Sequence, residues 1–398
     1  MMTRLLSPLS GTTPALRGAL FYLGYWGVFG VYDPLTNVYY SQLGLSGSQI
    51  GVLAALVPLM TMLVALPISA ISDRRAMRVS VLRIALAGLA TSLLFLGLPK
   101  AFIAILPIAA ILSAFRAPTG PISDSLIVRM SVRHGVDYGN LRLWGSLGFA
   151  ISAIVFGWVW GEVGLGWMFA GAALLFLPVM AVSFSLEEGP KVARKAQRPL
   201  REIGRDHGLV ILLAATYLAQ GGLLVSSFFS GVYLMEIGGT AILVGLLFAL
   251  FAITEIPAMR WTRPLMARIG GPRTLLLAYA LSAVAVFGFA VAPTPAFFLA
   301  AAALRGFGYG FFFVATVRML DMRVPQEWAS SVQALMYAGG FGLVPLLASL
   351  AAGVVYDARG GPAVFFGSFL MIAAGGILLA VAGAAGLLRQ HATVRERA

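Results

Sequence analysis

The sequence predicts an all-α membrane protein with twelve transmembrane helices in two pseudo-symmetric six-helix bundles. Of the 398 residues, 60% are hydrophobic and only 11% are charged, whereas a soluble globular chain carries about 25% charged residues. Apolar stretches recur twelve times, and a helix needs about 20 apolar residues to span a bilayer. The longest polar stretch, residues 187–207, follows the sixth of them. We therefore expect two halves joined by a central loop.

The expected helices follow one another with short polar connections. They cover residues 15–42, 47–71, 78–98, 101–130, 140–160, 165–185, 208–236, 242–262, 273–293, 295–319, 328–356 and 361–388. The residues before the first helix have no continuous apolar core and no small-residue cleavage site. We expect them to form a cytoplasmic leader and not a cleaved signal peptide. The expected domains are an N-terminal bundle at 1–186, a cytoplasmic central loop at 187–207 and a C-terminal bundle at 208–398.

The positions of the basic residues predict the orientation in the membrane. If the N-terminus lies inside, 24 of the 28 Lys and Arg residues fall in inner segments, and only Lys100 and Arg359 fall in outer loops. This asymmetry predicts that both termini lie in the cytoplasm, in a plasma or inner membrane. The cytoplasmic loops also explain the net charge of +13, so we expect no nucleic-acid partner.

The residue inventory argues against an enzyme. The sequence has no cysteine, which excludes disulfides, cysteine nucleophiles and thiolate metal sites. Its histidines, His134, His207 and His391, fall in polar connecting segments or the tail. A membrane-embedded enzyme would need clustered nucleophiles, bases or metal ligands at one depth. We therefore expect no catalytic residue, no metal and no cofactor.

A short motif connects the second and third expected helices. It reads SAISDRRAMR at residues 69–78 and resembles the major facilitator superfamily signature G-x-x-x-D-R-x-G-R-R. A weaker copy at residues 265–273 occupies the equivalent place in the second half. The resemblance implies the major facilitator fold and alternating access of a site between the halves. It also implies a cytoplasmic gate that contains Asp73, Arg74 and Arg78.

A narrower resemblance involves the fourth and fifth expected helices. Asp124 and the sequence DYGNLRLWGS at residues 137–146 resemble the phenylpropionate permease branch and, more distantly, lactose permease and the oligosaccharide:proton symporters. In lactose permease an acid on helix four pairs with an arginine on helix five, and both hold the sugar. Asp124 and Arg142 match these positions. The stacking tryptophan of that family corresponds to Phe149.

The second half departs from the lactose permease pattern. Its proton-coupling histidine and glutamate on helix ten correspond to Arg305 and Gly308, and its helix-eleven lysine corresponds to Phe341. Helix seven offers Gln220 but no acid, while Glu255 resembles the helix-eight glutamate of these permeases. The resemblance therefore does not imply a lactose-type proton relay or a sugar specificity.

Charged residues inside the expected helices are the main candidates for function. Each costs about 2.5–3.5 kcal/mol to insert, so those present usually line a cavity or pair with one another. The candidates are Asp33, Arg116, Asp124, Arg142, Glu255 and Arg305. We expect polar and aromatic side chains nearby to complete a substrate site. These are Asn37, Trp144, Phe149, Gln220 and Tyr337.

Asp33 has two interpretations. It precedes Pro34, which removes a backbone donor and favours a kink beside a polar cavity. We expect a cavity residue that binds substrate or a proton; the alternative is a structural salt bridge to an arginine such as Arg305. Arg116 and Arg305 occupy matching places in the two halves. They either favour an anionic substrate or neutralise Asp33 and Glu255.

Two further acids also leave alternatives open. Asp124 and Arg142 lie eighteen residues apart on consecutive helices, so they can face each other as an ion pair that releases one partner to a ligand. The alternative is a structural or gating pair. Glu255 lies mid-helix, where desolvation disfavours the anion and suits the residue to proton coupling. Its alternative role is a protonated acid bonded to a backbone carbonyl.

Together these observations predict a secondary active transporter. We expect it to move a small organic solute, either a sugar, a nucleoside or an aromatic carboxylate, by symport with protons through Glu255 or Asp33. The alternative is a proton-driven exporter of drugs or sugars, and a receptor-like binding protein is a further possibility. The expected partners are the solute, protons and the lipid bilayer, and the expected oligomeric state is a monomer.

Overall fold

The computed structural model describes residues 13–188, 204–325 and 328–388. Within these ranges every regular element is a helix and no strand occurs. The expected cytoplasmic leader lies almost wholly outside the described residues, as do most of the central loop and the end of the tail.

The N-terminal half contains helices that match the first six expected ones. In order they are α2 (Pro14–Gln42), α3 (Gly47–Met60) with a π-helical turn at Thr61–Ala65 and α4 (Leu66–Arg75), α5 (Arg78–Leu96), α6 (Phe102–His134), α7 (Tyr138–Val163), and a 3₁₀ turn at Leu165–Trp167 followed by α8 (Met168–Ser183). The second expected helix is therefore not a uniform α-helix, since a π turn separates α3 from α4.

The C-terminal half repeats the pattern. Its helices are α10 (His207–Glu236), α11 (Ala241–Ile269), α12 (Gly271–Ala290), α13 (Pro295–Arg323), α14 (Ala329–Tyr337), a π-helical segment at Ala338–Leu343, and α15 (Val344–Ala384). The backbone of α15 turns sharply at Gly360, whose φ of 73° and ψ of −178° are not helical. The last two expected helices are therefore the two parts of α15 on either side of this residue, with α14 beginning the first of them.

Ten helical segments in the described ranges are long and apolar enough to cross a membrane. One of them, Ser331–Ala384, contains the turn at Gly360, and α2 is not among the ten although it is 29 residues long. The count of twelve expected helices thus depends on dividing α15 and including α2. The protein is an all-α integral membrane protein, as the composition predicts.

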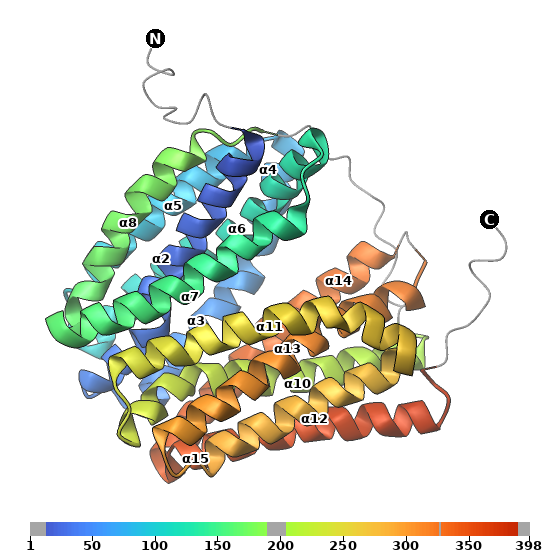
Figure 1. Ribbon diagram of the computed structural model, residues 1–398. Helices are drawn as coiled ribbons and strands as arrows, with labels where there is room; N and C mark the ends of the chain where they lie inside the picture. The colour runs from blue at the N-terminus through green and yellow to red at the C-terminus, as the bar shows by residue number, and fades with distance from the viewer. Residues whose placement is uncertain (1–12, 189–203, 326–327, 389–398) are drawn as a thin grey trace.

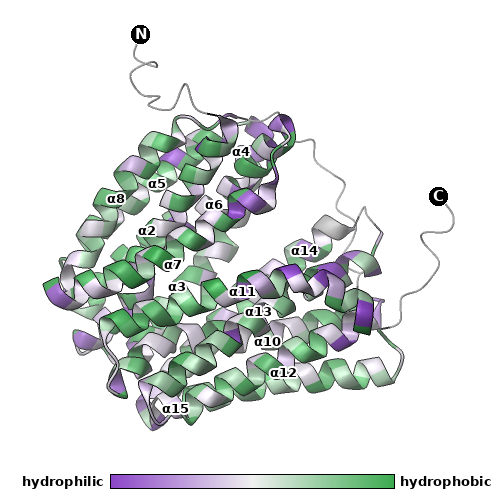
Figure 2. Ribbon diagram, viewed as in Figure 1, coloured by the Kyte–Doolittle hydropathy of each residue, from purple (hydrophilic) through white to green (hydrophobic). Residues whose placement is uncertain are grey.

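The two halves lie close together at one end and apart at the other. Figure 1 shows the N-terminal helices leaning away from the C-terminal ones toward the ends that carry α4 and α14, and the start of α2 and the end of α15 lie at these separated ends. Apolar residues cover most of each helix, while polar ones gather near the helix ends and loops (Figure 2). We call the separated end the terminal side and the opposite end the sealed side.

Small residues bring the halves together on the sealed side. A Cβ atom at Gly51 of α3 would lie 2.6 Å from the carbonyl oxygen of Ser349 in α15, and one at Gly245 of α11 would overlap the carbonyl oxygen of Ala153 in α7. Backbones can approach this closely only where a side chain is missing. The α3–α15 and α7–α11 contacts therefore close the space between the halves at this end.

Candidate functional site

Two cavities lie between the halves. The inner cavity, of about 310 Å³, includes Asp33, Asn37 and Tyr40 of α2 and Phe228 of α10 in its lining. The outer cavity, of about 610 Å³, extends toward the terminal side and includes Asp124 in its lining. Both lie beside the middle of the bundle, where a transporter of this architecture holds its substrate.

The two cavities share part of their wall. The residues common to both linings are Val57, Ser113, Arg116 and Phe341. Arg116 is the charged member of this set, so its guanidinium is accessible from either cavity. A solute moving from one cavity to the other would pass this side chain.

Asp33 and Arg116 form a bidentate ion pair at this shared wall. Nη1 and Nη2 of Arg116 donate to Oδ1 and Oδ2 of Asp33, each at 2.6 Å. Both side chains remain partly exposed, at 27% for Arg116 and 30% for Asp33. The guanidinium also lies over the Phe29 ring, 4.7 Å from its centroid. The arginine beside Asp33 is therefore Arg116 of α6 and not Arg305.

Arg305 is buried within the C-terminal half and contacts neutral groups. Its Nη2 donates to the carbonyl oxygen of Leu223 at 2.8 Å and to the hydroxyl of Ser227. Its guanidinium lies 4.2 Å from the centroid of the Phe251 ring. Among the described residues no carboxylate forms an ion pair with it. Its positive charge is therefore held by neutral dipoles and an aromatic face.

Asp124 accepts a hydrogen bond from the hydroxyl of Tyr22 at 2.7 Å. Arg142 does not form an ion pair with it; instead its guanidinium lies over the Trp26 ring at 4.5 Å and near the Tyr22 ring at 5.8 Å. The expected acid and arginine thus lie near the same aromatic residues of α2 without direct contact. The Tyr22 hydroxyl also lies 3.4 Å from that of Tyr138.

Glu255 lies in α11 of the C-terminal half. Among the described residues its carboxylate has no hydrogen-bond or ion-pair partner. The charged groups close enough to act on it electrostatically are Arg142 of the N-terminal half and Arg305 of its own half. This acid is therefore within electrostatic reach of one arginine from each half, and no described residue hydrogen-bonds its carboxylate oxygens.

The other expected site residues divide into two groups. Asn37 and Phe149 line the inner cavity, and Tyr337 lines the outer one. Gln220 is buried in α10, and Trp144 is 46% exposed; neither is part of the two cavity linings. The structure thus brings three of these five residues to the cavities.

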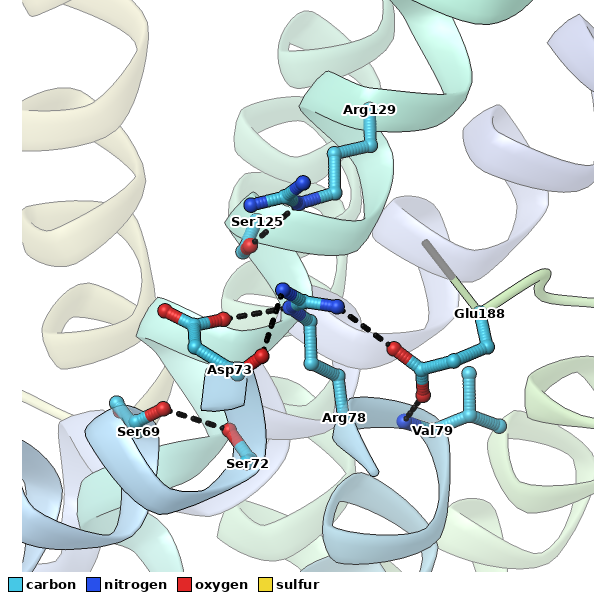
Figure 3. A network of polar contacts seen from close by, with 8 residues as sticks. All are labelled: Ser69, Ser72, Asp73, Arg78, Val79, Ser125, Arg129 and Glu188. Atoms are coloured by element: carbon cyan, nitrogen blue, oxygen red, sulfur yellow. Dashed lines mark hydrogen bonds and ion pairs between the residues drawn. The ribbon is translucent and has the colours of Figure 1, made fainter. Parts of the chain in front are cut away.

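The expected gate residues lie on the terminal side of the N-terminal half. Arg78 is fully buried, and it donates to Asp73 at 2.5 Å and to Glu188 at 2.8 Å (Figure 3). Glu188 also accepts from the backbone N–H of Val79 at 2.9 Å. Arg74 is exposed. The motif therefore joins the end of α4 and the start of α5 to the beginning of the central loop.

Sequence reasoning did not predict the polar contacts of three residues in these networks. Glu188 begins the central loop, and its position beside the motif was not evident from the chain order. Tyr22 carries the partner hydroxyl of Asp124, and Asp357 of α15 binds the N-terminus of α3. A signal existed for Tyr22, because it lies on the same expected helix as Asp33. No sequence pattern linked Asp357 to α3, because Asp357 and Ser48 of α3 are 309 residues apart in the chain.

Comparisons with known proteins give a consistent picture. Residues 16–367 match the family described as "MFS_1 like family". The chain is 30% identical over 341 residues to a maltose permease of Geobacillus stearothermophilus, covering 85% of this chain and 86% of that protein. It is 27% identical over 288 residues to the "Probable 3-phenylpropionic acid transporter" of Escherichia coli (strain K12), covering 69% and 74%.

A solved structure shares the fold. The crystal structure of the nucleoside transporter NupG superimposes with a TM-score of 0.80 at 15% identity, covering 94% of this chain and 99% of that one. At this identity the likeness concerns the arrangement of the helices alone.

Proposed function

The chain belongs to the MFS_1 like family, so it is a solute transporter and not an enzyme, and from this premise we propose that it moves a small organic solute by proton symport. The solute alternates between the two sides of the membrane as the halves rock about the central cavities. The substrate-binding groups we propose are the expected residues that line those cavities, with Arg142 and Arg305 close by.

One observation carries this proposal most directly. The Asp33–Arg116 ion pair lies where the inner and outer cavities meet, on the path between a sealed end and a separated end. Ionisable groups in a membrane interior are costly and are retained where they serve transport. A pair that is partly exposed to both cavities can bind a ligand or a proton in one state and re-form in the other.

The names of the relatives support a small organic solute. One relative is named as a maltose permease and another as a 3-phenylpropionic acid transporter. The cavities offer both polar groups and aromatic faces, including Phe149 in the inner cavity and Tyr337 in the outer one. Aromatic faces contact either a flat ring or the apolar face of a sugar.

Two acids are the proposed proton carriers. Asp33 has one partner, Arg116, which a ligand can replace, and Glu255 has no hydrogen-bond partner among the described residues. Neutralising a carboxylate removes the cost of keeping a charge in the membrane interior while the halves move. We place Asp73, Arg74 and Arg78 at a cytoplasmic gate, with both termini in the cytoplasm and the protein acting as a monomer.

Uptake into proteoliposomes tests the proposal. Purified protein should catalyse counterflow of a labelled solute, with maltose and 3-phenylpropionate as the first probes. An inward proton gradient should then raise the accumulation of the transported probe, and a protonophore should abolish that rise. Counterflow without any response to the gradient would contradict proton symport and leave facilitated transport. Binding of a probe with no counterflow would contradict transport itself.

A further inference from the structure

We propose that the substrate is a small carboxylic acid whose carboxylate binds Arg116 in place of Asp33 once Asp33 has taken up the symported proton. This inference rests on the proposed transport function and specifies its substrate class. The step consists of one proton binding to an Asp33 oxygen and one carboxylate exchanging for another on Arg116. No covalent bond of the substrate forms or breaks.

The geometry of Arg116 favours a carboxylate ligand. Both of its terminal nitrogens are engaged by the two oxygens of one carboxylate, at 2.6 Å each. A substrate carboxylate has the same shape and charge as the Asp33 side chain, so it can occupy the same two hydrogen bonds. A hydroxyl of a neutral solute offers a single oxygen and no charge, and would leave the guanidinium under-compensated.

The charges of the central region also favour a carboxylate as the substrate. Three acids and three arginines lie there within the helices: Asp33, Asp124, Glu255, Arg116, Arg142 and Arg305. With all six ionised the charges balance, so each added proton leaves one guanidinium without a balancing negative charge. An uncompensated charge in a low-dielectric region is costly. A substrate carboxylate restores the balance, whereas a neutral sugar cannot.

The groups around the ion pair leave Asp33 as the proton acceptor. Three tyrosines lie within electrostatic reach of the pair: Tyr32 and Tyr40 near Asp33, and Tyr25 near Arg116. The side chains that α7, α10 and α11 contribute to the inner cavity are uncharged; they are Phe149, Leu224, Ser227, Phe228 and Phe248. Among the described residues that line this cavity, Asp33 is the only acid.

Three polar side chains of the inner cavity are already hydrogen-bonded to the protein. The amide of Asn37 already donates to the carbonyl oxygen of Phe228 at 2.8 Å, and the hydroxyl of Thr36 donates to Tyr32 at 2.9 Å. The hydroxyl of Ser227 donates to Leu223 at 3.0 Å and accepts from Arg305. A polyhydroxylated solute would have to displace these bonds, although the hydroxyl of Tyr32, which also lines the cavity, has no hydrogen-bond partner among the described residues.

The remaining lining favours an apolar or aromatic body. Phe149, Phe228, Phe248 and Phe341 surround the inner cavity, and its volume of about 310 Å³ is at the small end for ligand sites. The predicted substrate is therefore a monocarboxylate with a compact aromatic or aliphatic body. Uptake of its anion with one proton carries no net charge across the membrane.

The test compares an acid with its uncharged counterpart. Proteoliposomes containing the full chain are loaded separately with labelled 3-phenylpropionate, 3-phenylpropionamide and maltose. We expect counterflow of the acid and at least tenfold slower counterflow of the amide and of maltose. Accumulation of the acid should follow the pH gradient and should not change when a potassium diffusion potential is imposed.

Two variants examine the ion pair directly. Asp33→Asn keeps the shape of the side chain but cannot bind a proton as a carboxylate does, so gradient-driven accumulation of the acid should fall far more than its counterflow. The double variant Asp33→Asn with Arg116→Gln preserves the balance of charge and should lose acid counterflow at least tenfold. Asp321→Asn, on the terminal side of α13, is the matched control and should behave as wild type. A thermal unfolding scan of each variant checks that it is folded.

The outcomes separate the two levels of the proposal. Gradient-driven accumulation of maltose or of the amide, with none of the acid, would overturn the carboxylate inference and leave the transporter proposal standing. Full acid counterflow in the folded double variant would also overturn it. Absence of counterflow for every probe would contradict the proposed function itself.

Discussion

The carboxylate of Asp357 in the C-terminal half caps the helix that begins beside Ser48 in the N-terminal half. Oδ2 of Asp357 accepts from the backbone N–H of Ser48 at 2.8 Å and from its hydroxyl, and Oδ1 accepts from the backbone N–H of Gly47 at 2.5 Å. Free N–H groups and the positive end of the helix dipole make an N-terminus favourable for a carboxylate. This contact joins the halves on the sealed side and must break when that side opens.

Asp357→Ala should therefore favour opening of the sealed side. Loss of a cap costs about 1–2 kcal/mol, which corresponds to roughly a tenfold increase in the population open on that side. The sequence has no cysteine, so Ala54→Cys in the inner cavity supplies a single thiol. Its labelling by an impermeant reagent added from the sealed side should become several-fold faster.

Glu236→Ala is the matched control for this change. Glu236 accepts from the hydroxyl of Tyr356 at 2.6 Å, but both residues belong to the C-terminal half, so their contact survives rocking. Labelling should then stay at the wild-type rate. Equal labelling of the two variants would mean that the Asp357 cap does not control opening.

The α7–α11 contact allows a comparison of two glycines one turn apart. A Cβ atom at Gly157 would lie 2.9 Å from the carbonyl oxygen of Ala241, whereas one at Gly161 would lie 3.6 Å from the Ala241 methyl group. Overpacking of this kind costs about 1–3 kcal/mol. Gly157→Ala should thus speed labelling of the Ala54→Cys reporter, and Gly161→Ala should leave it unchanged. Faster labelling in Gly161→Ala than in Gly157→Ala would contradict a seal based on backbone contact between α7 and α11.

Ala76 is strained where it ends α4. Its φ and ψ are both 52°, in the left-handed region, which costs an L-residue roughly 1–2 kcal/mol. Ala76→Gly should stabilise the protein by about 1 kcal/mol in thermal unfolding in detergent. Ala70→Gly, inside the same helix, should instead destabilise it by about 0.5–1 kcal/mol. A loss of stability in Ala76→Gly would show that the methyl group contributes packing that outweighs the strain.

The start of α10 provides a pH-dependent contact outside the membrane spans. Asp206 accepts two hydrogen bonds from Arg323, at 2.9 and 2.7 Å, and one from the backbone N–H of Leu209 at 3.1 Å. Partial burial opposes ionisation, but these hydrogen bonds outweigh it and hold the pKa of Asp206 below its usual value. Its contribution to stability is therefore present above the unfolded pKa of about 3.9 and is lost as pH falls through the lower folded value.

Asp206→Ala should accordingly be less stable than wild type by about 1–2 kcal/mol at pH 7, because both the cap and the ion pair disappear. The difference in unfolding temperature between wild type and Asp206→Ala should become smaller as the pH falls below about 4. Asp206→Asn retains a good N-cap, so its stability at pH 7 should lie between those of wild type and Asp206→Ala. A gap that is constant with pH would contradict a role for the ionised carboxylate.

The apolar runs predict the helices well, but not their interruptions. A stretch of some 20 apolar residues has no alternative to a helix in the bilayer, since every backbone group must be bonded within the chain. The π-helical turns at Thr61–Ala65 and Ala338–Leu343 lie inside such runs. They contact each other across the two halves, an arrangement that the local sequence does not contain.

The pairing of buried charges is predictable only in part. The sequence identifies Asp33, Arg116 and Asp124 as intramembrane charges, and composition alone suffices for that. It does not give the partners, since Asp33 and Arg116 are 83 residues apart and Tyr22 and Asp124 are 102 apart. Which side chains meet depends on the rotation and crossing of the helices. The narrower resemblance suggested an Asp124–Arg142 pair, but Tyr22 takes the hydrogen bond to Asp124 instead.

Glu255 provides the sharpest test of proton coupling. Its carboxylate has no hydrogen-bond partner among the described residues, and it lies within electrostatic reach of Arg142 and Arg305. Glutamine has nearly the same size but cannot bind the coupled proton. Glu255→Gln should therefore retain counterflow, which needs no net proton movement. It should also retain the accumulation, about tenfold at most per unit of pH difference, that symport with one proton allows, because Asp33 is the proposed carrier of that proton.

The control for Glu255→Gln is Glu236→Gln, an acid of the same half at the sealed end of α10, which should accumulate solute as wild type does. If Glu255→Gln loses counterflow together with accumulation, the glutamate binds the solute or shapes the site and its proton role is wrong. If it keeps counterflow and loses accumulation, Glu255 carries the coupling proton and the assignment of that proton to Asp33 is wrong. The paired measurement of counterflow and accumulation is needed because either one alone cannot separate a binding defect from an uncoupled transporter.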